Sequence, residues 1–148
     1  MLESMKVGKK AEIELVEFLT SKGYESSLNT DHEKRYEYDV LARKKNKVLT
    51  FEVKHDLMAT KTGNVAIEYR NSKQDKPSGI DRTTADYWCH KIDGDIYICK
   101  VKDLLKFIED NKPLRIVKSG GDNNADIYLY KKENFLSVAV ELSTYVFK

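Results

Sequence analysis

The chain has few cysteines and no long apolar run. Of its 148 residues only Cys89 and Cys99 are cysteines, and neither lies in a Cys-x-x-Cys motif or in a Cys/His spacing typical of a metal site. Two thiols cannot form a disulfide framework and favour a reducing compartment. The first residues lack the apolar core of a signal peptide, and no segment approaches the length of a membrane span. We therefore expect a cytoplasmic protein with no membrane partner.

Several catalytic signatures are also missing. The sequence has no glycine-rich phosphate loop, and Ser78 near Gly79 does not form the nucleophile elbow of serine hydrolases. It contains no internal repeat, low-complexity tract or domain linker. With 41% hydrophobic and 34% charged residues, it is typical of a soluble globular domain, and we expect residues 1–148 to form one.

The formal net charge of +2 is too small to indicate a nucleic-acid-binding protein by itself. Phosphate backbones are bound by local basic patches rather than by total charge. One such concentration surrounds residues 43–61, although a solvated hairpin tip explains residues 44–47 equally well. Its basic residues are Arg43, Lys44, Lys45, Lys47, Lys54 and Lys61.

Hydrophobic periodicity predicts an alternation of helices and strands. The spacing of Ala11, Leu15 and Leu19 predicts a helix over 7–22 that ends at Gly23. Thr83, followed by Asp86, is similar to a capping box and predicts a helix over 83–91. The long irregular segment 71–82 is expected to be a functional loop. Strands are expected at 24–28, 36–43, 48–54, 65–70, 95–100, 114–118 and 126–130, and further helices at 101–108 and 134–142.

The segment Tyr36–Asp56 is the most informative part of the chain. If residues 44–47 form a four-residue hairpin loop, Arg43 pairs with Val48 and Asp39 lies opposite Glu52. Directly opposed residues share a face, with Cβ atoms about 5 Å apart, and alternation places Lys54 on the face of Glu52. The same register gathers six apolar or aromatic side chains on the other face, and a slip of one residue would destroy both patterns. These six are Tyr38, Val40, Ala42, Leu49, Phe51 and Val53.

Two carboxylates and one ammonium group on a shared face suit metal-dependent phosphodiester chemistry. Carboxylate oxygens are hard ligands for divalent cations, and a nearby lysine can stabilise an anion or orient water. An ordinary surface hairpin whose charges are solvated, or held in a weak cross-strand ion pair, is the structural alternative.

With the surrounding elements, these residues resemble the PD-(D/E)xK nuclease superfamily, which has the restriction-endonuclease-like fold. Asp39 matches the first acidic motif and Glu52-Val53-Lys54 matches E-x-K, although Tyr38 replaces the usual proline before the aspartate. The first helix, from Gly8-Lys9-Lys10-Ala11-Glu12, resembles that of Holliday-junction resolvases. Residues 77–88 are reminiscent of phage and bacterial members. The resemblance covers about residues 7–100 and leaves about 101–148 as a C-terminal extension.

The resemblance implies an α/β (α+β) fold with a central mixed sheet flanked by helices. The expected order is αβββαβ, followed by an αββ(α) extension. It also implies that Asp39 and Glu52 bind Mg²⁺ or Mn²⁺ with the Val53 carbonyl, and that Lys54 acts on the water or the developing charge. In similar nucleases a helix glutamate reaches the metal, which would be Glu12; Glu14 and Glu17 offer the same chemistry on other helix faces.

Other charged residues carry weaker predictions. Glu68 could support the metal or pair with Arg70, and the pair is the preferred interpretation. His55, His32 and His90 show no sign of a catalytic partner, and Tyr87 and Trp88 are expected on a helix. Loop cations beside the metal are candidate contacts to DNA phosphates, although each alone could be a surface charge. They are Lys61, Arg70, Lys73, Lys76 and Arg82.

The sequence thus predicts a Mg²⁺-dependent endodeoxyribonuclease, structure-specific in the manner of junction resolvases. A sequence-specific restriction or repair nuclease of the same fold is one alternative, and a non-catalytic DNA-binding module is another. DNA is the expected partner, and the two strands of a duplex are consistent with a homodimer.

Overall fold

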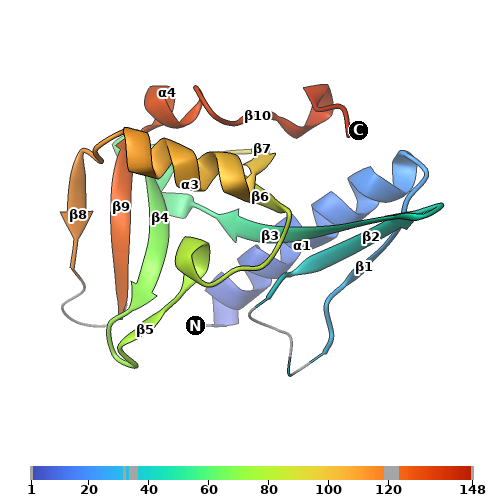
Figure 1. Ribbon diagram of the computed structural model, residues 1–148, viewed down its shortest axis with the longest axis horizontal. Coiled ribbons are helices and arrows are strands. Elements are labelled where there is room, and N and C mark those ends of the chain that lie inside the picture. Colours follow the sequence, from blue (N-terminus) through green and yellow to red (C-terminus); the bar gives the residue numbers. More distant parts are fainter. Residues whose placement is uncertain (1, 32, 34–36, 119–123, 148) are drawn as a thin grey trace.

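The computed structural model of the protein describes residues 2–31, 33, 37–118 and 124–147, with side chains from residue 9 onward. It contains two β-sheets (Figure 1). The larger sheet has six strands in the order β1-β2-β3-β6-β7-β10, of which β3 and β6 are parallel and the other neighbours antiparallel. Its strands are β1 (Glu25–Leu28), β2 (Val40–Lys44), β3 (Lys47–His55), β6 (Tyr87–Ile92), β7 (Asp95–Lys100) and β10 (Val140–Glu141).

The smaller sheet has the order β5-β4-β9-β8 and is antiparallel throughout. It consists of β4 (Asn64–Asn71), β5 (Lys76–Pro77), β8 (Arg115–Val117) and β9 (Ala125–Lys131). The helical segments are α1 (Leu2–Ser21), α2 (Leu57–Thr62), η1 (Gly79–Asp81), α3 (Val101–Asp110), α4 (Lys132–Phe135) and η2 (Leu142–Thr144). No helix among the described residues is long and apolar enough to cross a membrane.

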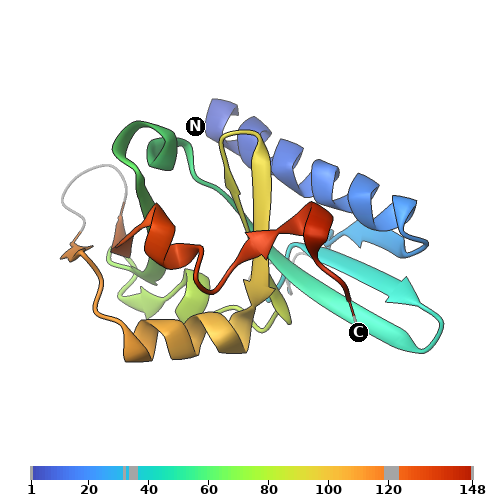
Figure 2. The same cartoon turned by 90° about the horizontal axis from the view of Figure 1, so that it is seen from above.

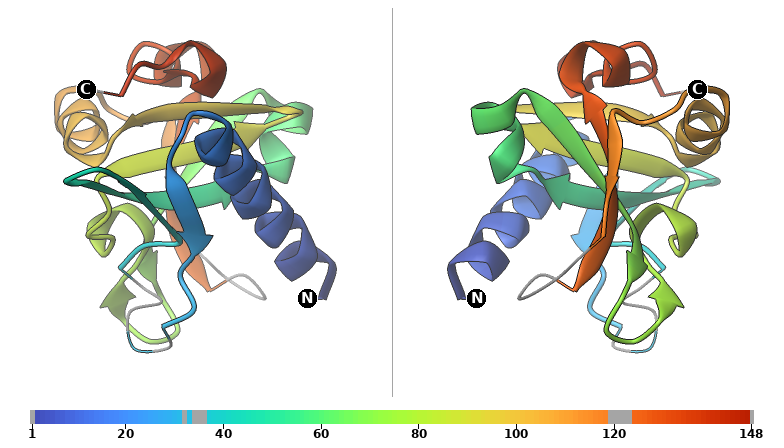
Figure 3. Two further views of the ribbon diagram at one scale, coloured as in Figure 1. Left: turned by 90° about the vertical axis from the view of Figure 1, so that its right-hand side faces the viewer. Right: turned by 90° about the vertical axis from the view of Figure 1, so that its left-hand side faces the viewer.

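The core is divided between the two faces of the larger sheet. On one face, Leu15 and Leu19 of α1 pack against Phe51 and Val53 of β3. On the other face, Trp88 of β6 packs against residues of the smaller sheet and of α3. Figure 2 and Figure 3 show α1 and α3 on opposite sides of the larger sheet. Both faces of the sheet are therefore covered, as expected for a mixed sheet with a parallel pair at its centre.

The hairpin has the predicted register with a tighter turn. Arg43 pairs with Val48, and the ladder continues to Val40 opposite Phe51. Lys44 and Lys47 also pair, so the turn has two residues rather than four, with Lys45 at a φ of 55°. The predicted apolar face is the face that packs on α1, where Val40, Ala42, Leu49, Phe51 and Val53 are buried. Tyr38 is only half-buried.

The predicted helix over 83–91 is wrong, because residues 87–92 form β6. Every residue of β6 is buried, so the strand has no polar alternation. The residues that suggested a helix cap make tertiary hydrogen bonds instead. The Asp86 carboxylate accepts from the main-chain N–H and the hydroxyl of Thr50, and the Thr83 hydroxyl donates to Glu52. Tertiary pairing with β3 outweighs the local signal, and Tyr87 and Trp88 lie on a strand.

Two other predictions of elements need correction. The predicted helix over 134–142 is replaced by the short α4, by β10, where Val140 pairs with Ile98 of β7, and by the start of η2. The strand predicted at 65–70 exists as β4, but it pairs with β9 in the smaller sheet. The predicted α+β class with a mixed central sheet flanked by helices is confirmed.

Candidate active site

Strand β3 places Glu52 and Lys54 on the face opposite the α1 core. Lys54 Nζ lies 3.1 Å from Glu52 Oε2, and the Thr83 hydroxyl donates to Glu52 Oε1 at 2.9 Å. Only 9% of the Glu52 side chain is exposed, compared with 37% of the Lys54 side chain. Burial of a carboxylate requires hydrogen-bond or ionic partners, and here one comes from each side. Lys54 also lies over the Trp88 ring, with Nζ 5.9 Å from the ring centroid.

Asp39 is held beside these residues by the hairpin backbone. Its N–H donates to the Phe51 carbonyl at 2.8 Å, and its Oδ2 accepts from the Val53 N–H at 2.8 Å. Within a strand the N–H and C=O of one residue point to the same side, so the Val53 carbonyl points to the side of β3 on which Asp39 lies. The predicted grouping of Asp39 with Glu52 and Lys54 is therefore found in the structure.

The carboxylates of this group are partly buried and lie close enough to affect one another's pKa. Burial raises the pKa of Glu52 to about 7, and the Asp39 charge adds to the rise while Lys54 opposes it. Burial also raises the pKa of Glu12 to about 7, again with a contribution from Asp39. Burial lowers the pKa of Lys54, but Glu52 and Asp39 outweigh it and the net shift is upward. A positive charge near these acids would be stabilised.

Glu12 is the glutamate of α1 that belongs electrostatically to this group, since Asp39 and Lys54 both affect its pKa. Glu14 instead forms an ion pair with Lys91, and Glu17 is exposed. The sequence did not decide which of these three glutamates lies near the site, and the structure favours Glu12.

A cavity of about 290 Å³ connects Asp39, Glu52 and Lys54 with the segment between β4 and β6. Within the described residues, no group of three or more His, Cys, Asp and Glu side chains is arranged to hold a metal ion. A cation ligand set would therefore consist of the Asp39 and Glu52 carboxylates, the Val53 carbonyl and water. These are the hard oxygen donors that Mg²⁺ accepts, because it keeps several waters when it binds to proteins. The cavity is lined by Asp39, Glu52, Lys54, Glu68, Asn71, Gln74, Pro77, Ser78, Gly79 and Arg82.

Comparison with known proteins supports this architecture. No family model and no curated protein matches the sequence. The structure is similar to that of the bacterial homing endonuclease I-Ssp6803I, with a TM-score of 0.52 and 17% identity over 67% of this chain and 70% of that chain. It is also similar to Hjc, a Holliday junction resolvase from the archaeal hyperthermophile Archaeoglobus fulgidus, with a TM-score of 0.51 and 11% identity over 95% of this chain and 98% of that chain.

The protein has the restriction-endonuclease-like fold. This confirms the fold that the sequence resemblance implied. At these levels of identity the similarity concerns the fold alone, so the roles of individual residues depend on the geometry described above.

The residues predicted to contact DNA differ in their position relative to the cavity and in their ion pairs. Arg82 lines the cavity, and Lys73 and Lys76 are exposed in the adjoining segment. Lys61 is exposed in the last turn of α2. Arg70 forms ion pairs with Asp75 and Asp126, so its charge is largely balanced within the protein.

The expected pair between Glu68 and Arg70 is not present among the described residues. Glu68 lines the cavity instead, and its charge contributes to the upward pKa shift of Lys54. The β4 ladder is irregular between Glu68 and Arg70, so simple strand alternation from the sequence does not describe this segment. Glu68 is thus a functional candidate that the sequence interpretation set aside.

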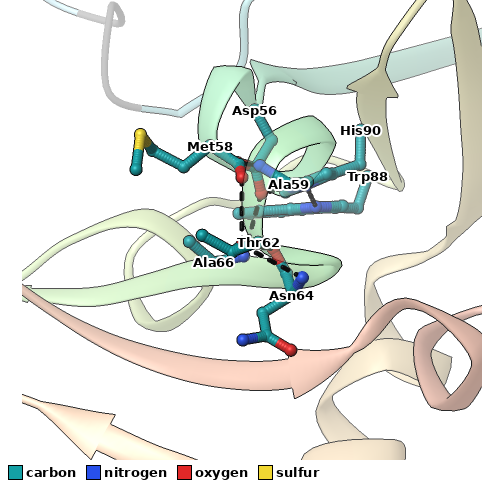
Figure 4. Close-up of polar contacts among 8 residues, drawn as sticks. All are labelled: Asp56, Met58, Ala59, Thr62, Asn64, Ala66, Trp88 and His90. Carbon is teal, nitrogen blue, oxygen red and sulfur yellow. Dashed lines mark hydrogen bonds and ion pairs between the residues drawn. The ribbon is translucent and has the colours of Figure 1, made fainter.

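A buried polar network next to the site was also missed (Figure 4). The Trp88 Nε1–H donates to His90 Nδ1 at 3.1 Å, and His90 Nε2 lies 2.9 Å from Asp56 Oδ2. Since Nδ1 accepts a hydrogen bond, the imidazole proton is on Nε2 and is donated to the carboxylate. Asp56 also accepts from the N–H groups of Ala59 and Ala66.

This network fixes the end of β3 just beyond Lys54. It joins β3, α2, β4 and β6 through one carboxylate, and the Asp56 N–H adds a bond to the Lys91 carbonyl at 2.9 Å. Burial acts to raise the pKa of Asp56, but the His90 and backbone hydrogen bonds outweigh it and lower that pKa. The sequence signal for this network is a tryptophan and a histidine two residues apart, which share a face when the segment is a strand. Because a helix was predicted for this segment, the shared face was not recognised.

Proposed function

We propose that the protein is a metal-dependent endodeoxyribonuclease that hydrolyses DNA phosphodiester bonds, with residues 1–148 acting as one nuclease domain. The observation that carries the proposal is the convergence of Asp39, Glu52 and Lys54 on one cavity. They reach it from two segments whose register is fixed by the opposite, apolar face. A solvated surface hairpin would not bury Glu52 or raise its pKa to about 7.

The donor set fits a hard divalent cation. A buried carboxylate with a raised pKa is unfavourable unless its charge is compensated. Glu52 is in this state, and the half-buried Glu12 has a pKa that is also raised to about 7. Bound Mg²⁺ or Mn²⁺ would polarise the scissile phosphate and lower the pKa of an attacking water. Asp39, Glu52 and the Val53 carbonyl would supply the protein ligands, and Glu12 would accept a hydrogen bond from a water in the same group.

Lys54 is placed to act on the reacting phosphate. Its ammonium group is paired with Glu52 and remains partly exposed in the cavity. Its raised pKa keeps it protonated at neutral pH, so it would donate hydrogen bonds to the attacking water and to the phosphate oxygen that gains charge. Trp88 and Glu52 restrain the side chain from two sides.

The decisive experiment is a cleavage assay with purified protein and labelled linear, flapped and four-way-junction DNA, with and without Mg²⁺. Glu52→Gln and Lys54→Ala should each abolish cleavage while circular dichroism shows a folded protein. Glu109→Gln and Lys102→Ala, which alter exposed residues of α3, should cleave like the wild type. Wild-type cleavage rates in both active-site variants would refute the proposal.

The same assay separates the alternatives. We favour junction-type DNA because Hjc is matched over nearly its whole length. Faster cleavage of a linear duplex at one sequence would favour a restriction or repair nuclease. DNA binding without cleavage, and without Mn²⁺ binding by calorimetry, would favour a non-catalytic module. Size-exclusion chromatography with light scattering tests the proposed homodimer.

A further inference from the structure

The Ser78 side chain has an unusual environment in the cavity wall. Its Oγ atom is the only buried side-chain oxygen or nitrogen without a hydrogen-bond partner in the described part of the chain. Buried polar groups in native proteins are nearly always paired, and an exception calls for a missing water, ion or ligand. Ser78 is therefore a candidate contact for something that binds in this cavity.

Both backbone polar groups of Ser78 are hydrogen-bonded, which restrains the position of its side chain. The Ser78 N–H donates to the Tyr69 carbonyl at 3.0 Å, and the Ser78 carbonyl accepts from the Asp81 N–H at 3.1 Å. Gly79 adds a second restraint, because it has a φ of +52° and lies against β4. A Cβ at Gly79 would lie 2.1 Å from the Glu68 carbonyl oxygen. The wall that carries Ser78 is thus fixed to the strand that carries Glu68.

The rest of the wall indicates the chemistry of the ligand. Asn71 and Gln74 are neutral, Arg82 is cationic and Glu68 adds a carboxylate, whereas Asp39 and Glu52 lie with Lys54. A hydroxyl donor and a guanidinium group that line one cavity suit the oxygens of a phosphate. Ser78 as a residue is partly exposed, although its Oγ atom is shielded. A phosphate could therefore reach the Oγ atom only after a side chain of the cavity wall has moved.

We propose that Ser78 and Arg82 form a phosphodiester subsite for the DNA backbone beside the cleavage centre, in which the Ser78 hydroxyl donates to a non-bridging phosphate oxygen. The inference rests on the proposed function, because it takes DNA as the ligand. The carboxylates of Asp39, Glu52 and Glu68 repel a phosphate unless a cation lies between, but Ser78 and Arg82 bind it without a cation. The subsite therefore contributes to DNA binding even without a divalent metal.

The test is fluorescence anisotropy with labelled duplex and four-way-junction DNA in EDTA, where cleavage cannot occur. Ser78→Ala should raise the Kd about tenfold, because one hydrogen bond to a charged phosphate is lost. Its unfolding temperature should equal or exceed that of the wild type, since the hydroxyl it removes has no partner in the protein. A structural role for the hydroxyl would lower that temperature. Ser137→Ala, which removes an exposed hydroxyl bonded to the Asn134 carbonyl, should change neither quantity.

Salt dependence separates the two members of the subsite. Ser78 is uncharged, so Ser78→Ala should leave the slope of log Kd against log salt unchanged. Arg82→Gln should reduce the magnitude of that slope by the amount that corresponds to about one phosphate contact. A wild-type Kd in Ser78→Ala, or a lower unfolding temperature, overturns the subsite even if the wild type cleaves DNA. Failure of the wild type to bind any of the DNAs would overturn the proposed function and the subsite together.

Discussion

Replacement of Glu52 by glutamine should stabilise the protein and abolish its proposed activity. The pKa of Glu52 is about 7 in the fold, compared with about 4.3–4.5 in an unfolded chain. An acid whose pKa is raised by folding destabilises the folded state once it ionises, so the cost grows as the pH rises from about 4.5 to about 7. Glutamine keeps the shape and the hydrogen-bond capacity of the protonated acid without that cost.

The size of the effect follows from the shift. Each pKa unit corresponds to about 1.4 kcal/mol, so Glu52→Gln should gain about 3 kcal/mol at pH 8 and less than about 1 kcal/mol at pH 5. For a chain of this length, about 3 kcal/mol is on the order of 10 °C in the unfolding temperature. The comparison is made by thermal and urea unfolding from pH 5 to pH 8.

Controls and metal addition sharpen this test. Glu109→Gln makes the same chemical change at an exposed position of α3 and should show no pH-dependent gain. Mg²⁺ should raise the unfolding temperature of the wild type at pH 8 but not that of Glu52→Gln, because a ligand stabilises only the form that binds it. A stability difference that stays constant between pH 5 and pH 8 would contradict the assignment of Glu52 as a strained, buried acid.

Three further predictions follow from the neighbours of Glu52. Asp56→Asn should lower the free energy of unfolding by about 1.5–3 kcal/mol at pH 7, because hydrogen bonds to a charged group are lost. Folding lowers the pKa of Asp56, so the wild type should lose this stability as the pH falls below about 3.8, whereas the variant should not. Urea unfolding at each pH measures the difference. Gly79→Ala should lower the free energy of unfolding by at least about 1–2 kcal/mol, because the backbone at this position is left-handed. Cleavage should also fall, because the new Cβ would contact the Glu68 carbonyl and displace β4. An unchanged unfolding midpoint would disprove the close approach. Thr83→Val removes the hydroxyl that donates to Glu52 and helps to lower the pKa of Glu52. The pH profile of Mg²⁺-dependent cleavage should therefore move to higher pH by less than about one unit. A movement to lower pH would show that the hydrogen bond has another role.

The sequence was informative where a buried face fixed a strand register. Alternation along residues 38–54 placed five apolar residues in the core and brought Asp39 together with Glu52 and Lys54. It failed for residues 87–92, because a strand that is buried on both faces shows no alternation and Thr83 and Asp86 imitate a helix cap. Cap-like residues are short hydrogen-bonding side chains, and these also serve tertiary bonds.

The sequence by itself determined the hairpin, the terminal helix pattern and the identity of the acids and the lysine, because these depend on contacts between residues close together in the chain. Only the tertiary structure decided that β6 lies parallel to β3, that Asp56, His90 and Trp88 form one buried network, and that Ser78 and Glu68 share a cavity with Lys54. These contacts join residues from separate strands, and their geometry is set by how the two sheets pack rather than by any local pattern.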